Sequence, residues 1–204
     1  EKQFTDLCVA AGVKRLVKMS SMEATATAET PIPRAHWAVE EYIRASGPAW
    51  TMVKPNFFMQ NLLASAKSIR EQGRFSLPMG GGTTGMADAR DIGAVCAEVL
   101  IGKGHAGKSY EITGPEVLTF NQVAERFSEV LGRKIEYVPM PMAQFRERMT
   151  GVLKPWHLDA VCALFQEIAD IGLDHTTDTF RKLIGREPIP LRQFIADHAA
   201  LFRT

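Results

Sequence analysis

The chain has 204 residues, of which 46% are hydrophobic and 23% are charged, and its 24 basic residues nearly balance its 23 acidic ones. This length allows one core, or one core with a small second lobe. Charges of both signs are interleaved, so we expect a small-molecule substrate and no nucleic-acid partner. No apolar run reaches the about 20 residues of a membrane span, so no membrane partner is expected either.

The three cysteines, Cys8, Cys96 and Cys162, lie far apart in apolar stretches of helical pattern. This spacing argues against a disulfide framework and against a thiolate metal site, and it fits a reducing, cytoplasmic location. His105, His157, His175 and His198 stand alone, without the Cys, Asp or Glu neighbours that metal sites need. We therefore predict no metal.

Helices and strands alternate through the first part of the chain. A helical face through Phe4, Leu7, Cys8 and Ala11 ends at Gly12 and leads into the first strand. The elements that follow are predicted as a strand at 15–19, a helix at 33–45, a strand at 50–54, a helix at 57–72, an extended piece at 74–79, a helix at 92–101 and a strand at 109–113. This alternation predicts an α/β protein with a parallel sheet.

The remaining part is mostly helical. Thr119 and Gln122 have the spacing of a capping box, and residues 134–138 alternate like a half-exposed strand. Helices are predicted at 120–131, 143–152, 158–171, 178–184 and 191–202. The pattern therefore divides into an α/β core over residues 1–115 and a helical lobe over residues 116–204, packed on the core and able to share its sheet.

Polar residues follow two of the predicted strands. Ser20 and Ser21 follow the first of them, and Asn56 follows the second. Ligands of open α/β sheets bind outside the carboxyl ends of the strands, so these residues should face one crevice. The helix between the strands carries His36 in its first turn, nearest the same rim, with Glu40 one turn further on the same face.

Two other patterns are interpreted as structural. Gly80-Gly81-Gly82 lacks the preceding strand and directly following helix that a phosphate site needs, so it predicts a surface turn. Asp88 and Asp91 resemble paired catalytic carboxylates, but capping of the helix that follows explains them better.

Several blocks resemble the NmrA-like family of atypical short-chain dehydrogenases/reductases, in family order over nearly the whole chain. They are AGVKRLVKMSS, HWAVEEYIRASGPAWTMVKPNFFMQNLL, GRFSLPMG, ADARDIGAV, GKSYEITGPEVLTFNQVAE and LIGREPIPLRQFIADH. The resemblance implies the C-terminal part of a Rossmann-type parallel sheet with a small, mostly helical substrate lobe. Residues 1–115 would then be a partial NAD(P)-binding core.

The resemblance also implies roles for particular residues. Ser21 and His36 would be catalytic, and His36 stands where related reductases place the lysine that holds the nicotinamide ribose. Ile32 occupies the position of their tyrosine, so the usual general acid is missing and ordinary carbonyl reduction is in doubt. The implied cofactor contacts are Ser20, His36, Pro55, Asn56, Phe57 and Phe58, and the candidate substrate contacts are Met22, Asn61 and Trp156.

Structural roles remain open for these residues. Ser20 and Ser21 can simply end a strand, and His36 can be a solvated residue of its helix. Asn61 can bond a substrate or cap local backbone. Trp156 can pack in a core or close over an apolar substrate, whereas Phe165 is interpreted as core.

No glycine-rich turn precedes Ser20, and the chain opens at Glu1 within a helical pattern. Such a turn receives the pyrophosphate of a dinucleotide, so we expect NADP or NAD to bind the full-length protein and to bind this truncated chain weakly or not at all. The strand at 15–19 would lack its neighbours, leaving an unpaired edge. Three explanations of the missing strands are considered: the natural polypeptide is longer, the chain covers this edge by forming a homo-oligomer, or the chain is a degenerate paralogue. We favour the first.

The function implied by the resemblance is an NAD(P)H-dependent oxidoreductase acting on a small conjugated acceptor such as a quinone. Such acceptors can take a proton from water, so the missing tyrosine matters less for them than for a ketone. Two other functions remain open. One is a non-catalytic redox sensor that binds the nucleotide, and the other is an isomerase or other non-redox enzyme that reuses the crevice.

Overall fold

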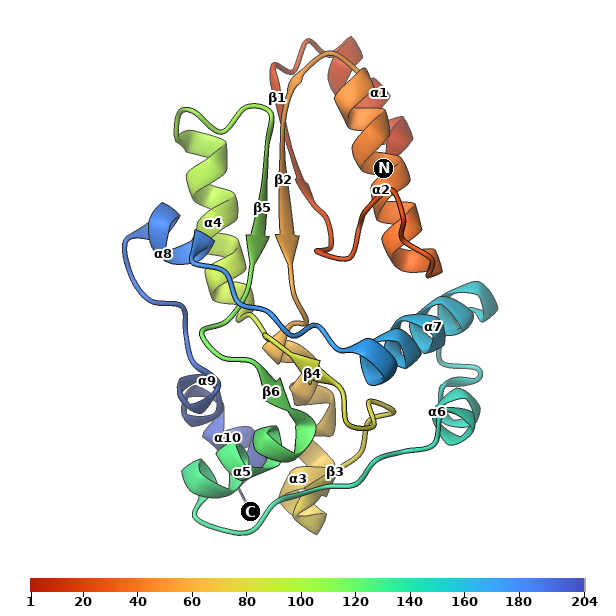
Figure 1. Cartoon of the computed structure of the whole chain (residues 1–204), viewed down its shortest axis with the longest axis vertical. Coiled ribbons are helices and arrows are strands. Elements are labelled where there is room, and N and C mark those ends of the chain that lie inside the picture. The colour runs from red at the N-terminus through yellow and green to blue at the C-terminus, as the bar shows by residue number, and fades with distance from the viewer. Residues whose placement is uncertain (204) are drawn as a thin grey trace.

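Three parallel strands form the sheet that positions the site (Figure 1). They are β1 (Arg15–Met19), β2 (Ala49–Pro55) and β5 (Lys108–Ile112), in the order β1-β2-β5. Met19 pairs with Val53, and Pro55 pairs with Ile112, so the carboxyl ends of the strands meet at one edge. The structure is a computed structural model and describes residues 1–203. The predicted α/β fold with a parallel sheet is confirmed.

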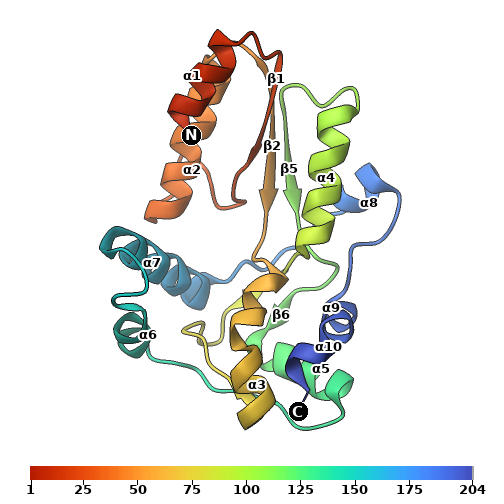
Figure 2. The same ribbon diagram turned by 180° about the vertical axis from the view of Figure 1, so that it is seen from behind.

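Helices cover both faces of this sheet. α2 packs on one face of β2, and α4 packs against β1 and β2 from the other side, as Figures 1 and 2 show. The helices of this part are α1 (Lys2–Ala10), α2 (Pro31–Ala45), α4 (Ala89–Ile101) and α8 (Thr179–Ile184). The apolar side chains buried between the sheet, α4 and α8 include Val53, Ile92, Val95, Ile112 and Phe180. β1 lies at one edge of the described sheet, as the sequence predicts.

The lower part of the molecule in Figure 1 is mostly helical. It contains the 3-10 helix η1 (Met59–Ser65), α3 (Ala66–Gln72), α5 (Phe120–Leu131), α6 (Met142–Met149), α7 (Pro155–Ile171), α9 (Leu191–Asp197) and α10 (Ala199–Phe202). Two short strand pairs complete it: β3 (Arg74–Phe75) with β7 (Glu136–Tyr137), and β4 (Thr83–Thr84) with β6 (Leu118–Thr119).

The main apolar cluster of this lower part draws residues from both sides of position 115. Met59, Ile69 and Phe75 come from before it, and Phe120 and Phe127 from after it. The division into residues 1–115 and 116–204 stays a prediction, and position 204 lies outside the described residues.

Several predicted elements differ in their limits. The helix predicted at 57–72 is wrong in its first half, where Phe57 lies in a bend, Phe58 is extended and a 3-10 helix follows. The reason is tertiary, because the backbones of Phe57 and Met59 exchange hydrogen bonds with Ala87. The helix predicted at 92–101 begins at Ala89, since the Asp88 side chain accepts a bond from the Arg90 N–H.

Changes at the other helices are smaller. The last predicted helix, 191–202, is interrupted at His198, and the helix predicted at 158–171 begins earlier, at Pro155. The helix predicted at 143–152 spans 142–149, and the strand predicted at 134–138 shortens to 136–137. The capping box of Thr119 and Gln122 is confirmed.

The glycine triplet forms a turn whose last residue packs against α7. Gly80 and Gly81 are exposed, as expected of a surface turn, but Gly82 is buried. A Cβ placed on Gly82 would lie 2.2 Å from the carbonyl oxygen of Ile168. Because Gly82 has no side chain, α7 can pack closely against the segment that leads into β4. One face of α7 forms a wall of the site described below.

Within residues 1–203, no helix is both long and apolar enough to cross a membrane. The same residues include no group of three or more His, Cys, Asp or Glu side chains arranged to hold a metal ion.

Candidate functional site

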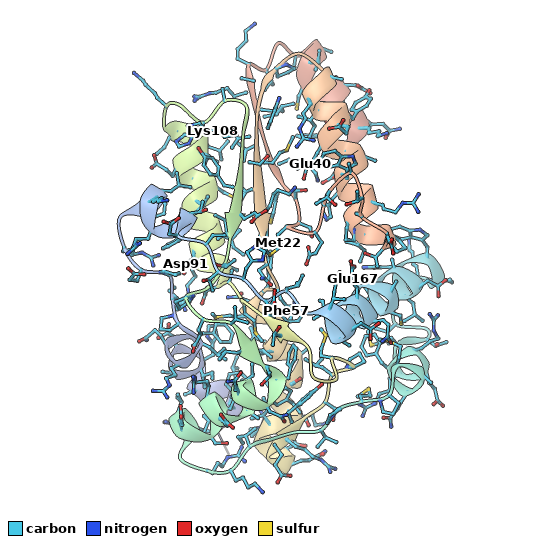
Figure 3. All side chains as sticks on the ribbon, in the orientation of Figure 1. Met22, Glu40, Phe57, Asp91, Lys108 and Glu167 are labelled. Carbon is cyan, nitrogen blue, oxygen red and sulfur yellow. The ribbon has the colours of Figure 1, made fainter. Side chains whose placement is uncertain are left out.

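A cleft of about 320 Å³ lies at the carboxyl ends of β1 and β2. Three walls enclose it: the segment after β1, the segment after β2, and one face of α7. Figure 3 shows Glu167 on α7 beside the segment that follows β1. The lining residues are Met19, Ser20, Ser21, Glu23, His36, Pro55, Asn56, Phe57, Phe58, Asn61, Leu164, Phe165 and Ile168.

Other hollows are larger, at about 510, 630 and 430 Å³; they lie between α3 and α6, beside α8, and between α1 and α2. Mostly polar and charged side chains line the first two, and none of the three draws residues from the carboxyl ends of both β1 and β2. The cleft above is therefore the candidate site, because ligands of open α/β sheets bind at that position.

The structure brings most of the predicted site residues to this one cleft. Ser20 and Ser21 reach it from β1, His36 from α2, and the segment 55–58 from β2, with Asn61 beside them. Their chemical roles remain predictions. The geometry supports the rule that polar residues after neighbouring parallel strands share a crevice.

Met22 and Trp156 are not brought to the cleft. Met22 is 6% exposed, and its N–H donates to the carbonyl oxygen of Pro55 at 3.4 Å. Trp156 is 63% exposed near the first turn of α7 and contacts the ring of His157. The substrate contacts predicted for these two residues find no support in this geometry.

His36 has a defined partner on one ring nitrogen. The Lys18 ammonium lies 3.2 Å from Nδ1 of His36, and Lys18 also pairs with Glu1 at 3.0 Å. An ammonium can only donate, so Nδ1 accepts and the ring proton sits on Nε2. Burial, followed by the charge of Lys18, lowers the pKa of His36. His36 is thus a neutral imidazole that can offer an N–H to a ligand.

Ser20 is committed to a buried carboxylate. Its hydroxyl donates to Glu40 at 2.5 Å, and Glu40 is fully buried. The same carboxylate accepts a bond from Arg44 at 2.6 Å and lies 3.4 Å from the Lys54 ammonium. This network fixes the end of β1 against α2 and β2. Ser20 can therefore contribute surface to a ligand, but its hydroxyl is already bonded.

The Asn56 side chain also forms its hydrogen bonds within the protein. Its amide oxygen accepts from the Phe57 N–H at 2.6 Å and from the Thr84 hydroxyl at 2.7 Å, and its amide nitrogen reaches the Leu173 carbonyl at 3.5 Å. Asn56 is 1% exposed. It holds the turn after β2 in shape, and Phe57 and Phe58 of this turn line the cleft.

The sequence did not single out several residues of the cleft. Glu23 follows the strand without any motif spacing, and Leu164 and Ile168 read as ordinary apolar helix positions. Phe165, interpreted as core, does contact the Phe57 and Phe145 rings, with centroids 6.4 and 5.3 Å away, yet it also lines the cleft. Leu164 and Ile168 are four positions apart, and Phe165 and Ile168 are three apart. This helical spacing was the available sequence signal that the three residues share one apolar face of α7.

A model of the NmrA-like family matches residues 1–194. The chain belongs to the NmrA-like family. It is 38% identical over 195 residues to an NAD(P)H azoreductase of Xenophilus azovorans, covering 94% of this chain and 68% of that protein. It is 28% identical to quinone oxidoreductase 2 of Escherichia coli, covering 92% of this chain and 65% of that protein.

A solved structure gives the same assignment for the fold. The NADPH-dependent quinone oxidoreductase of Escherichia coli in complex with NADPH matches with a TM-score of 0.85 and 27% identity, covering 98% of this chain and 70% of that chain. The resemblance inferred from the sequence blocks is confirmed, and so is the Rossmann-type fold.

Proposed function

We propose that this protein is an NAD(P)H-dependent oxidoreductase that reduces a small conjugated acceptor, such as a quinone or an azo compound. The observation that carries the proposal is the cleft, which joins a neutral histidine, the turn after β2 and an aromatic wall at the carboxyl ends of β1 and β2. The similarity to an azoreductase and to a quinone oxidoreductase supports the acceptor class.

The donor set of the cleft fits the nicotinamide ribose of NADP or NAD. His36 offers its Nε2–H to a ribose hydroxyl, and the turn of Pro55 to Phe58 supplies backbone and aromatic edges beside the ring. When bound, the reduced cofactor supplies a hydride. The chain's own residues bind and orient the acceptor.

The α7 side of the cleft suits a flat, apolar acceptor. Leu164, Phe165 and Ile168 face the turn after β2, where Phe57 packs against Phe165. Aromatic side chains favour offset or tilted stacking with planar rings and exclude water from them. We therefore propose a small molecule as the partner, with no role for nucleic acid or a membrane, and a cytoplasmic location for the protein.

A redox sensor that binds the nucleotide without turnover is the second candidate. It is favoured by Ile32, a half-buried residue of the first turn of α2 at the position of the missing tyrosine. A sensor needs no proton donor there. Consumption of the cofactor separates the two candidates.

The test uses protein purified from its native source, so that any sequence preceding Glu1 is retained. NADH and NADPH oxidation is followed by absorbance with a panel of quinones and azo dyes, and a simple ketone serves as the control acceptor. We expect oxidation with the conjugated acceptors and much less with the ketone, because two-electron reduction of a quinone gives a stabilised aromatic anion, whereas a simple ketone would give a strongly basic alkoxide. Cofactor binding without oxidation would favour the sensor, and neither binding nor oxidation would refute both.

A further inference from the structure

We propose that Glu23, acting through the Ser21 hydroxyl, is the proton donor to the reduced acceptor. This inference rests on the proposed function and names the acid that the position of Ile32 lacks. Glu23 and Ser21 both line the cleft, and the Ser21 hydroxyl donates to the Glu23 carboxylate; the hydroxyl must turn to accept from Glu23 when that carboxyl group is protonated. A hydroxyl both donates and accepts, so Ser21 can pass a proton from the carboxyl group to a ligand.

The loop that carries this pair is held in place on three sides. The Ala24 N–H donates to the Ser21 carbonyl oxygen at 3.1 Å, which closes a turn around Glu23. The Lys54 ammonium donates to the Ala24 carbonyl oxygen at 2.5 Å, and the Met22 N–H reaches Pro55. The pair is therefore positioned before a ligand arrives, as a proton donor requires.

The surroundings favour the protonated carboxyl group. Burial raises the pKa of Glu23, and the carboxylate of Glu167 on α7 raises it further, while the bond from Ser21 and the charge of Lys54 on β2 act in the opposite direction. Glu167 is anchored nearby, because its carboxylate accepts the Thr30 hydroxyl at 2.6 Å. Glu23 thus keeps its proton to a higher pH than an exposed glutamate.

The other polar groups of the cleft suit this role less well. From α2, His36 has a lowered pKa and is neutral, and Glu40 is bonded to Ser20 and faces Lys54. Ser20 is therefore bonded to a carboxylate that pairs with Arg44 and does not line the cleft, whereas Glu23 lines it. Ser21 and Glu23 are the remaining pair in which a carboxyl group and a hydroxyl are hydrogen-bonded to each other and both line the cleft.

Hydride addition leaves a quinone as an oxygen anion. An O–H bond forms on that oxygen as the Ser21 O–H bond breaks, and the Ser21 oxygen takes the proton of Glu23. The Glu23 carboxylate then regains a proton from water. In sum, the acceptor gains one hydride and one proton, and the side chains return to their first state.

The first test needs neither cofactor nor turnover. Carboxyl-carbon NMR of the 204-residue chain is used to titrate Glu23, and we expect a pKa above the about 4.3 of an unperturbed glutamate. Glu167→Gln should lower this pKa by removing a like charge, and Ser21→Ala should raise it by removing a hydrogen bond to the carboxylate. A Glu23 that titrates at the ordinary value, or that ignores both changes, would overturn the proposal.

The second test measures quinone reduction by the native-source protein and its variants. Glu23→Gln should lower kcat by about 100-fold, the low end for loss of a general acid, with little change in KM. Wild-type kcat should fall as the pH rises through the pKa of Glu23, and the variant should lose this dependence. Glu29→Gln, an exposed carboxylate in the same loop, is the matched control and should behave as wild type.

Unchanged urea unfolding of Glu23→Gln shows that the variant folds. If Glu23→Gln retains both kcat and the wild-type pH profile, the donor role is refuted while the proposed function stands. A wild-type protein that oxidises no NAD(P)H with any acceptor refutes the proposed function and the donor role together, whatever the NMR titration gives.

Discussion

Replacement of Glu40 by glutamine should destabilise the protein strongly. Glu40 is fully buried, and its two oxygens bond Ser20 and Arg44 and face the Lys54 ammonium. The Lys54 side chain is itself only 9% exposed. In Glu40→Gln this ammonium stays buried without its counter-charge, and one amide proton faces another donor.

The magnitude follows from this geometry. Breaking a buried ion pair by removing one partner costs about 3–5 kcal/mol. The lower end applies, because Lys54 keeps its bond to the Ala24 carbonyl oxygen and Arg44 keeps its pair with Glu41. A loss of about 3 kcal/mol should lower the melting temperature by about 6–12 °C in a domain of this size.

Glu41→Gln is the matched control. Glu41 also pairs with Arg44 at 2.6 Å, but its side chain is 55% exposed. Exposed pairs contribute about 0–1 kcal/mol, so this variant should unfold close to wild type. Urea unfolding of both variants at neutral pH, followed by circular dichroism, gives the two free energies of unfolding. Equal losses in the two variants would refute the assignment of a buried charge network.

Two further predictions concern His36 and the glycine turn. Burial and Lys18 lower the pKa of His36 in the folded state, so the unfolded chain binds more protons as the pH falls through about 6.5 and stability decreases. His36→Asn should lose less stability than wild type between about pH 7.5 and 5.5 in urea unfolding, and an unchanged slope would contradict the assigned neutral ring. Gly82→Ala should destabilise by about 1–3 kcal/mol, because its Cβ would lie 2.2 Å from the Ile168 carbonyl oxygen. Gly93→Ala, in open space on α4, should instead gain about 0.5–1 kcal/mol, and thermal melts that fail to separate the two variants would count against the packing of α7.

The local sequence determined the strands and much of one side of the cleft. The runs at 15–19, 50–54 and 109–113 are short, carry β-branched or aromatic residues and are bounded by glycine, proline or polar residues, and such patterns specify strands with little help from the rest of the chain. The parallel arrangement then places the residues after β1 and β2 at one edge. This rule is topological, so Ser20 and Asn56 could be assigned to a crevice without coordinates.

The same local pattern could not decide which of those side chains are available to a ligand. Asn56 and Ser20 were predicted at the cleft and lie there, but their polar atoms bond Thr84 and Glu40, which are distant in the sequence. Met22 follows the same strand and is buried instead. Hydrogen-bond partners and burial depend on which distant segments pack together, and no spacing in the sequence reports them.

The third wall of the cleft was decided by tertiary structure alone. Glu23 and Glu167 lie far apart in the sequence, yet the carboxylate of Glu167 on α7 raises the pKa of Glu23 in the loop after β1. Trp156 was the residue of α7 singled out for the substrate, but Leu164, Phe165 and Ile168 face the cleft. The choice depends on the rotation and approach of α7, which the bare backbone of Gly82 permits. Helical periodicity shows that a helix has an apolar face, whereas only packing shows what that face meets.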